Sequence, residues 1–268
     1  MAKQTLLPRM ETKSYNEVMG TLDLGFRENK LTVIFGSPGT GKSSALMEFA
    51  SLHTNAHIVL CSPTMNMKNL LVAIARCINT HVKGDPYTVQ QQVTEALIAD
   101  PNHILLFDEC ENLHRGDVSK IDVLRQIYDQ SDVNMVLCGT HKLHALLSGA
   151  NDHNQPQIFR RLLKAEFGVV SKKEVTTYLE QLENLLHIQF TSDARNELYS
   201  LCTDVENGGL GIFIAMLELM FSIIRPEWKD ICKAAKKNTE PTIDMNQLET
   251  VTIDRNTIRQ ASRFKMTK

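Results

Sequence analysis

The sequence is poor in aromatic residues and has no excess of either charge. Phe, Trp and Tyr make up 6% of its 268 residues although 43% are hydrophobic, so its core must be built largely from aliphatic side chains and Met. The 29 Lys and Arg nearly balance 31 Asp and Glu, which gives a formal net charge of −2. Bulk charge therefore cannot hold this protein on nucleic acid, and DNA binding would need a local basic patch or many weak sites in an assembly.

Cysteine pairing motifs and long apolar runs are missing as well. None of the six cysteines belongs to a CxxC pair, so buried free thiols in a reducing cytosol are the simplest interpretation. The N-terminal residues contain no apolar signal core. The most apolar stretch, Ile212–Ile224, is too short to span a bilayer and contains Glu218. We therefore expect a soluble, cytoplasmic protein with no membrane partner.

Short apolar runs alternate with helical patterns up to about Val170. The patterns predict strands over Leu31–Phe35, His57–Cys61, Ile104–Phe107, Val133–Cys138 and Glu166–Val170. They predict helices over Ser14–Gly20, Lys42–His53, Met65–Asn79, Tyr87–Ala99, Val118–Asp129 and Lys142–Ser148. Continuous apolar runs such as Ile104–Phe107 are typical of parallel strands that are buried on both faces.

The alternation stops after Val170, where Ser171 and Glu174 have capping-box spacing before an amphipathic helix. Further helices are predicted over Ser192–Cys202, Gly211–Ile224, Glu227–Lys237 and Thr252–Arg263. The expected fold class is α/β, a parallel sheet flanked by helices and followed by an all-helical subdomain. We expect an N-terminal extension (1–30), an α/β nucleotide-binding core (31–170) and a helical lid subdomain (171–268).

A phosphate-binding loop follows the first predicted strand. Residues Gly36–Ser43 fit the pattern G-x-x-x-x-G-K-[ST], with a strand before and a helix after it. Glycines allow backbone N–H groups to turn toward phosphate oxygens, Lys42 supplies a positive charge, and Ser43 can ligate Mg²⁺. The helix that begins here directs its positive end at the same anion. The nucleotide-binding residues predicted in this loop are Gly36, Ser37, Pro38, Gly39, Thr40, Gly41, Lys42, Ser43 and Ser44.

Two adjacent carboxylates follow the apolar run "ILLF". Asp108 and Glu109 end a strand that is predicted to be buried, and a buried charge is costly unless a cation or substrate meets it. We predict that Asp108 holds Mg²⁺ and helps to bind the nucleotide. Glu109 is predicted to orient and deprotonate the attacking water. Together with the loop, this pair predicts a site that hydrolyses ATP with Mg²⁺, and the water-activating Glu109 argues against a small-molecule kinase.

Two later signals fit the same chemistry. Thr140 comes directly after a predicted strand, where a polar side chain can reach the γ-phosphate and the water. Arg160 and Arg161 precede the last predicted strand, and an arginine there can stabilise transition-state charge in a neighbouring subunit. We predict a catalytic role for Thr140 and for one of the two arginines, without choosing between them.

With these motifs in place, the chain resembles the AAA+ ATPases. More narrowly, it is similar to the helper ATPases of DNA transposition, namely phage MuB and the TnsC/TniB group, with IstB more distant. The similarity rests on "VIFGSPGTGKSSALMEFA", "CSPTMNMKNLLVAIARCI", "LLFDECENL" and "MVLCGTHKLHALL". It covers about Leu31 to Val170 well and the predicted lid loosely.

This resemblance implies partners and a mechanism. In that family, ATP-bound subunits assemble head to tail on duplex DNA, recruit or stimulate a transposase, and dissociate after hydrolysis. The DNA-facing surface lies after the second strand, which corresponds to Lys68, Arg76, Lys83 and Thr88. The segment "NGGLGIFIAML" lacks the arginine that often senses nucleotide in the lid, and Arg195 or Arg225 is a weak substitute.

Other functions remain open at this level. An AAA+ core can also serve a replication initiator or helicase loader, a phage DNA-handling protein, an ExeA-type secretion ATPase or a signalling switch. A secretion ATPase usually has a membrane or envelope-binding module, which is not visible, and a switch that only binds nucleotide does not need Glu109. The ABC class is disfavoured because "LLSGAND" lacks the second glycine and the Gln of that class's signature.

Overall fold

The computed structural model describes residues 6–114, 120–148, 162–204, 209–245 and 248–265. By their contacts they form two compact units. The sheet unit comprises Ser14–Ser37 and Lys42–Phe167. The helical unit comprises Met1–Lys13, Pro38–Gly41 and Gly168–Lys268. The residues of the predicted N-terminal extension (1–30) are divided between these two units, and the three-part division of the chain stays a prediction.

A five-stranded parallel sheet lies at the centre of the sheet unit. Its order is β2-β3-β4-β1-β5. The strands are β1 (Thr32–Gly36), β2 (Ala56–Leu60), β3 (Ile104–Asp108), β4 (Asn134–Gly139) and β5 (Leu163–Phe167). The carboxyl ends of parallel strands meet at one edge, so Gly36, Asp108 and Gly139 end their strands on the same side.

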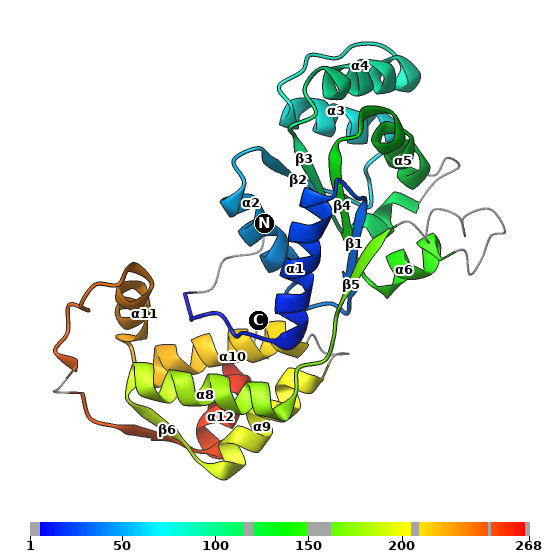
Figure 1. Cartoon of the computed structure of the whole chain (residues 1–268). Coiled ribbons are helices and arrows are strands. Elements are labelled where there is room, and N and C mark those ends of the chain that lie inside the picture. The colour runs from blue at the N-terminus through cyan, green and yellow to red at the C-terminus, as the bar shows by residue number, and fades with distance from the viewer. Residues whose placement is uncertain (1–5, 115–119, 149–161, 205–208, 246–247, 266–268) are drawn as a thin grey trace. The chain divides into compact units, whose positions relative to one another are not determined.

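Helices cover both faces of this sheet (Figure 1). One face packs against α1 (Lys13–Arg27) and α2 (Lys42–Leu52). The other packs against α3 (Met67–Cys77), α4 (Pro86–Ala99), the 3-10 turn η1 (Cys110–His114), α5 (Lys120–Ser131) and α6 (His141–Leu147). Successive strand residues point to opposite faces, so Val33 lies in one core and Ile34 in the other. The predicted parallel sheet flanked by helices is confirmed.

The fifth strand is displaced from its predicted position. It was expected over Glu166–Val170, whereas β5 runs over Leu163–Phe167 and pairs with β1. It is an edge strand whose charged residues are exposed, while Ala165 and Phe167 pack into the core. This alternation lacks the continuous apolar run that marks a central strand, so the pattern placed the strand too late.

The helical unit contains the helices predicted after Val170. They are α8 (Lys172–Leu186), α9 (Ser192–Thr203), α10 (Gly209–Ile224), α11 (Trp228–Lys237) and α12 (Arg255–Lys265). The capping box is present, because Ser171 accepts from the Glu174 N–H and Glu174 accepts from the Ser171 N–H. In the described part of the chain no single helix is long and apolar enough to cross a membrane, and α10 and α11 pass that test only together, as a pair bent by 118°.

A small parallel sheet within this unit was not predicted. β6 (Ile188–Phe190) pairs with β7 (Val251–Ile253), so the expected helix over Thr252–Arg263 begins too early. Its true start is set by Asp254, which accepts hydrogen bonds from the backbone N–H and the hydroxyl of Thr257. Strands of three residues are too short for periodicity to detect.

The two arginines considered as nucleotide sensors are both engaged inside the helical unit. Arg225 is buried, and its Nη2 donates to the carbonyl oxygens of His187 (2.9 Å) and Glu249 (2.6 Å). Arg195 forms an ion pair with Glu183 at 2.6 Å. These contacts join the segments that flank β6 and β7, which gives both side chains a structural role.

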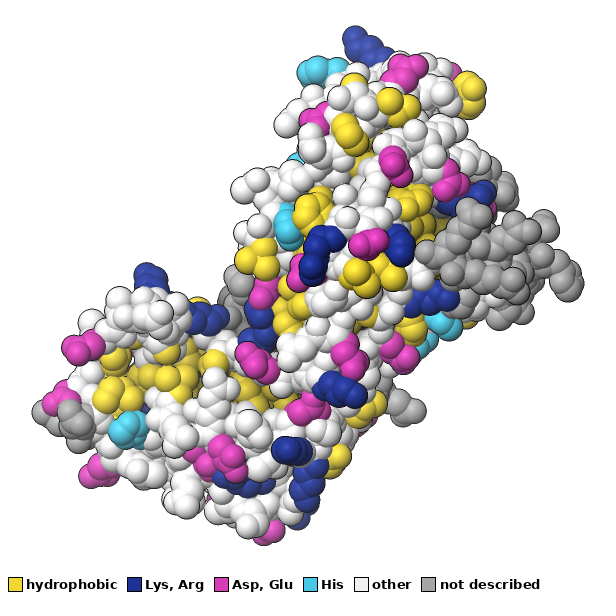
Figure 2. Space-filling model, viewed as in Figure 1, with side chains coloured by type: hydrophobic (Ala, Val, Ile, Leu, Met, Phe, Trp, Pro, Cys, Tyr) yellow, Lys and Arg dark blue, Asp and Glu magenta, His cyan; other side chains and the backbone are white. Residues whose placement is uncertain are grey.

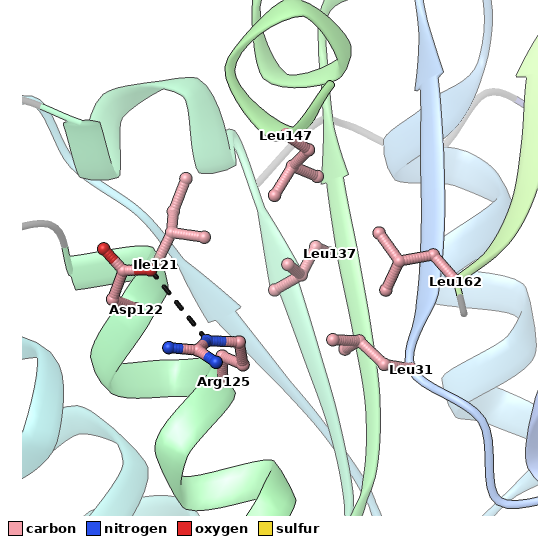
Figure 3. Close-up of a pocket in the computed structure, with 7 residues that line it drawn as sticks. All are labelled: Leu31, Ile121, Asp122, Arg125, Leu137, Leu147 and Leu162. Carbon is pink, nitrogen blue, oxygen red and sulfur yellow. Dashed lines mark ion pairs between the residues drawn. The ribbon is translucent and has the colours of Figure 1, made fainter. Parts of the chain in front are cut away.

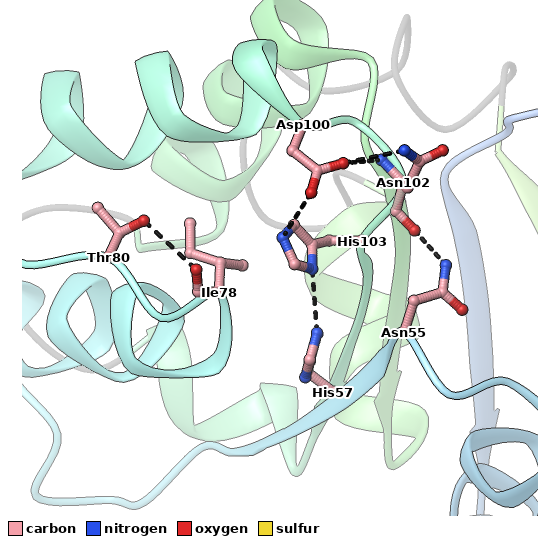
Figure 4. Close-up of polar contacts among 7 residues, drawn as sticks. All are labelled: Asn55, His57, Ile78, Thr80, Asp100, Asn102 and His103. Atoms are coloured by element: carbon pink, nitrogen blue, oxygen red, sulfur yellow. Dashed lines mark hydrogen bonds and ion pairs between the residues drawn. The ribbon is translucent and has the colours of Figure 1, made fainter.

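A pair of histidines lies at the amino-terminal ends of β2 and β3 (Figure 4). His57 Nε2 is 3.1 Å from His103 Nδ1, and His103 Nε2 is 3.6 Å from an Asp100 carboxylate oxygen. Burial and the neighbouring His103 lower the pKa of His57 below its ordinary value of 6.5. Protonation of His57 therefore opposes the native packing of edge strand β2.

This arrangement predicts a pH dependence of stability. Because the folded pKa of His57 lies below the unfolded value, the unfolded chain binds a proton first as the pH falls below 6.5, and acid lowers the free energy of unfolding. The variant His57→Gln should lose less stability between about pH 7 and pH 5 than the unmodified protein in urea titrations. The exposed His81→Gln is the control and should follow the unmodified protein. Parallel curves for all three proteins would contradict the prediction.

Candidate nucleotide-binding site

The loop after β1 has the backbone that the motif requires. It joins Gly36, the last residue of β1, to Lys42, the first of α2. Gly39 and Gly41 have φ values of 77° and 102°, which side chains rarely allow.

Lys42 is held against the loop that it follows. Its Nζ donates to the carbonyl oxygens of Gly36 (2.8 Å) and Ser37 (2.7 Å). Burial lowers the pKa of Lys42, while the carboxylates of Glu111 and Asp108 act in the opposite direction. A partly desolvated ammonium held by carbonyl oxygens is suited to a stronger anionic acceptor such as a phosphate oxygen.

Ser43 and Asp108 meet across the strand ends. The Ser43 hydroxyl donates to Asp108 Oδ2 at 2.6 Å, and Asp108 Oδ1 accepts from the Glu109 N–H at 2.9 Å. A hydroxyl and a carboxylate are hard oxygen ligands, so this pair fits Mg²⁺. Within the described ranges no group of three or more His, Cys, Asp or Glu could hold a metal ion. Such a group is not required, because Mg²⁺ is usually bound through one or two carboxylates plus substrate phosphates.

Glu109 has an unusual backbone conformation. Its φ is 59°, in the left-handed region that non-glycine residues rarely adopt. Its side chain is exposed, and Oε2 accepts from Asn112 Nδ2 at 3.3 Å. Strained residues of this kind concentrate at functional sites, where the surroundings hold them in place. The water-activating role of Glu109 remains a prediction.

Thr140 follows β4 and is contacted by a residue that the sequence analysis missed. Its backbone N–H donates to Glu111 Oε2 at 3.1 Å, while its hydroxyl accepts from the Lys142 N–H at 3.4 Å as the N-cap of α6. Glu111 can come this close because residue 139 is glycine, and an added Cβ there would collide with the Glu111 carboxylate. Thr140 therefore lies beside a carboxylate in addition to following β4.

A sequence signal for Glu111 and Asn112 does exist. Both lie in "DECEN", and a 3-10 turn that starts after β3 brings residue 112 back toward residue 109. The turn itself produces no hydrophobic periodicity in the sequence, so only the carboxylates of Asp108 and Glu109 were predicted as site residues. These two residues join the candidate site on geometry alone.

The predicted DNA-facing residues lie on or near α3 and α4. Lys68, Arg76 and Lys83 are exposed. The Thr88 hydroxyl donates to an Asp85 carboxylate oxygen at 2.7 Å, and Asp85 caps α4. A phosphate at Thr88 would compete with this cap and with its negative charge, so Thr88 is the weakest of the four.

Arg160 and Arg161 lie outside the described residues. Ser44 is exposed in the first turn of α2. All six cysteines are free, and five of them are buried. Burial raises the pKa of the Cys138 thiol, next to Asp108, well above its ordinary value.

An apolar pocket lies elsewhere in the sheet unit (Figure 3). The aliphatic side chains that line it are Leu31, Ile121, Leu137, Leu147 and Leu162. Arg125 and Asp122 form an ion pair beside them, with 3.9 Å between Nε and Oδ1. The pocket contains none of the predicted phosphate-binding residues, so it does not belong to the nucleotide site.

Comparisons with known proteins bear on this geometry. Residues 26–147 match the family model described as "AAA domain". The ORC1 protein of Aeropyrum pernix, solved in complex with DNA, matches this structure with a TM-score of 0.60 at 14% identity, covering 94% of this chain and 64% of that one. The resemblance to the AAA+ ATPases is thereby confirmed: the chain has their fold, and residues 26–147 match the AAA domain model.

More particularly, the chain is similar to a protein of a Mu-like prophage and to a protein of phage Mu. The Mu-like prophage FluMu DNA transposition protein B of Haemophilus influenzae is 23% identical over 175 residues, 64% of this chain and 60% of the relative. The ATP-dependent target DNA activator B of Escherichia phage Mu is 19% identical over 159 residues, 58% of this chain and 49% of the relative. The chain thus spans about half to three fifths of the length of these curated relatives.

The contact between Glu111 and Gly139 gives a prediction for stability. Gly139→Ala should displace the Glu111 carboxylate from Thr140 and press on Leu143, whose Cβ lies 3.0 Å from the added atom. The expected cost is about 1–3 kcal/mol in the free energy of unfolding, measured by urea titration.

Gly20→Ala is the matched control. Gly20 is exposed in α1, with no atom within 4 Å of an added Cβ, so this change should stabilise the protein by about 0.5–1 kcal/mol. Equal effects of the two substitutions would show that the approach of Glu111 to residue 139 is not tight.

Proposed function

We propose that this chain is an ATP-dependent, DNA-binding regulator of transposition. It assembles on duplex DNA with ATP bound, selects a target, recruits or stimulates a transposase, and disassembles on hydrolysis. The observation that carries the proposal is the meeting of Lys42, Ser43 and Asp108 at the strand ends of an AAA domain. The similarity to the two phage proteins supports transposition as the process in which this chain acts.

The residues of the site divide the chemistry among them. The phosphate loop and Lys42 bind the triphosphate, and Ser43 with Asp108 would hold Mg²⁺. When bound, Mg²⁺ neutralises charge on the phosphates. Glu109 orients the attacking water and takes its proton, and Thr140 contacts the γ-phosphate. Arg160 or Arg161 acts on the nucleotide of the neighbouring subunit, which makes hydrolysis depend on assembly.

In this proposal DNA binding comes from many subunits that each contribute a few weak contacts. On the face shown in Figure 2, positive and negative side chains are interspersed, in keeping with a net charge of −2. One subunit offers Lys68, Arg76 and Lys83 for phosphate contacts, which are too few for tight binding alone. A head-to-tail contact that does not close generates a helical filament, so weak sites add along the duplex.

The alternative functions are less well supported. An initiator or helicase loader fits the same fold, but the 14% identity to ORC1 supports the fold alone. Both curated relatives instead carry names that concern transposition or target DNA. Origin-specific DNA binding would favour a loader, and indifference to DNA would favour a secretion ATPase or a switch.

The role of Glu109 is testable by a change that keeps its shape. Glu109→Gln cannot accept the proton, so turnover should fall by about 10²–10⁴-fold while ATP binding persists. Subunits should then remain assembled on duplex DNA, visible as persistent filaments by negative-stain microscopy.

Lys42→Ala is the companion variant, and it should lose nucleotide binding and with it nucleotide-dependent DNA binding. Glu109→Gln with unchanged turnover and no trapped assemblies would show that another residue activates water. Unchanged DNA binding by Lys42→Ala would separate DNA binding from the nucleotide.

The basic residues on and after α3 give a prediction about salt. Replacing Lys68, Arg76 and Lys83 by Ala should weaken binding to all duplex sequences alike. If each contacts one phosphate, the slope of log K against log salt should fall in magnitude by about 3 per subunit. Fluorescence anisotropy with a non-hydrolysable nucleotide measures this slope.

The control replaces three exposed lysines of the helical unit by Ala, namely Lys172, Lys173 and Lys237. It removes the same formal charge and should leave the slope nearly unchanged. Equal slopes for the two triple variants would refute a specific role for the α3 region.

A further inference from the structure

The side-chain amide of Asn112 joins two parts of the sheet unit. Its Nδ2 donates to the backbone carbonyl of Cys61 at 3.0 Å and to Glu109 Oε2 at 3.3 Å. An amide nitrogen carries two N–H donors, so both hydrogen bonds can form at once. One side chain therefore contacts the predicted catalytic base and the residue that follows β2.

The position of Cys61 is itself tied to the carboxyl end of β3. Its backbone N–H donates to the Asp108 carbonyl at 2.9 Å, and its side chain is completely buried. The peptide groups on both sides of Cys61 are thus hydrogen-bonded, one to Asp108 at the end of β3 and the other to Asn112 in the turn that follows. A displacement of Cys61 would therefore act on Glu109 through the side chain of Asn112.

A short and ordered segment leads from Cys61 to α3. Only Ser62–Met65 lie between Cys61 and Asn66, which is the N-cap of α3. Pro63 restricts the backbone of this segment. The Met65 N–H donates to the Ser62 carbonyl at 3.0 Å, which closes a turn. A force on α3 is therefore transmitted to Cys61 through few rotatable bonds.

α3 carries Lys68 and Arg76, two of the proposed DNA contacts. From this chain of contacts we infer that Asn112 is a positioning residue that couples DNA binding at α3 to the placement of Glu109. The inference rests on the proposed function, because it assigns a regulatory path to the same site. DNA contact fixes α3, the fixed segment holds Cys61, and Asn112 transfers that restraint to Oε2 of Glu109.

The geometry at Glu109 suits this role. In the described structure its other carboxylate oxygen, Oε1, has no hydrogen-bond partner, which leaves it for the proton of the attacking water. The left-handed backbone of residue 109 stores strain and needs support from its surroundings. Supporting partners of a reacting group typically affect activity by about 10–100-fold, as they do around metal ligands.

The test measures ATP turnover with and without duplex DNA at saturating ATP, together with ATP affinity. In Asn112→Ala, turnover with DNA should fall to the DNA-free rate, while ATP affinity stays within about twofold of the unmodified protein. Asn112→Asp keeps the shape of the side chain but removes both donors, so it should lose the response in the same way. Asn196→Ala, the same change on the exposed surface of α9, is the control and should keep the response.

The outcomes separate this inference from the proposed function. Loss of the DNA response in Ala and Asp variants that still bind ATP supports the coupling. A full DNA response in either variant overturns it and leaves the proposed function intact. An unmodified protein that does not hydrolyse ATP, or hydrolyses it without regard to DNA, overturns both. Thermal unfolding of each variant shows whether a loss reflects misfolding.

Discussion

The hydrogen bond from Ser43 to Asp108 is the contact on which the rest of the site depends. It connects the start of α2 with the end of β3, although β4 lies between β1 and β3 in the sheet. The two residues can meet only if the three strands are parallel and end level with one another. The buried strands β1 and β3 secure that register through packing on both faces.

Several features of the site follow from this register. Lys42 is brought beside Glu111 and Asp108, so burial and nearby charge act on it in opposite directions. The turn after β3 places Asn112 against Cys61, a residue 51 positions earlier in the chain. These contacts all lie at the carboxyl ends of neighbouring strands, where ligands bind in open α/β sheets.

Much of this could be predicted from the sequence, because local patterns specify it. The phosphate loop has a fixed spacing, and buried strands such as Ile104–Asp108 appear as apolar runs. Contacts that depend on strand pairing produce no such local pattern in the sequence. The bond between Asn112 and Cys61 needs β2 beside β3, and the three-residue strands β6 and β7 pair although α9, α10 and α11 separate them in the chain.

The central claim is that the loop, Ser43 and Asp108 form a binding site for a triphosphate with Mg²⁺. Calorimetric titration of the purified chain with a non-hydrolysable ATP analogue tests it most directly, with and without Mg²⁺. We expect saturable binding of one nucleotide per chain that weakens markedly when Mg²⁺ is removed or when Asp108 is replaced by Asn. No measurable binding, or equally strong binding without Mg²⁺, would contradict the account.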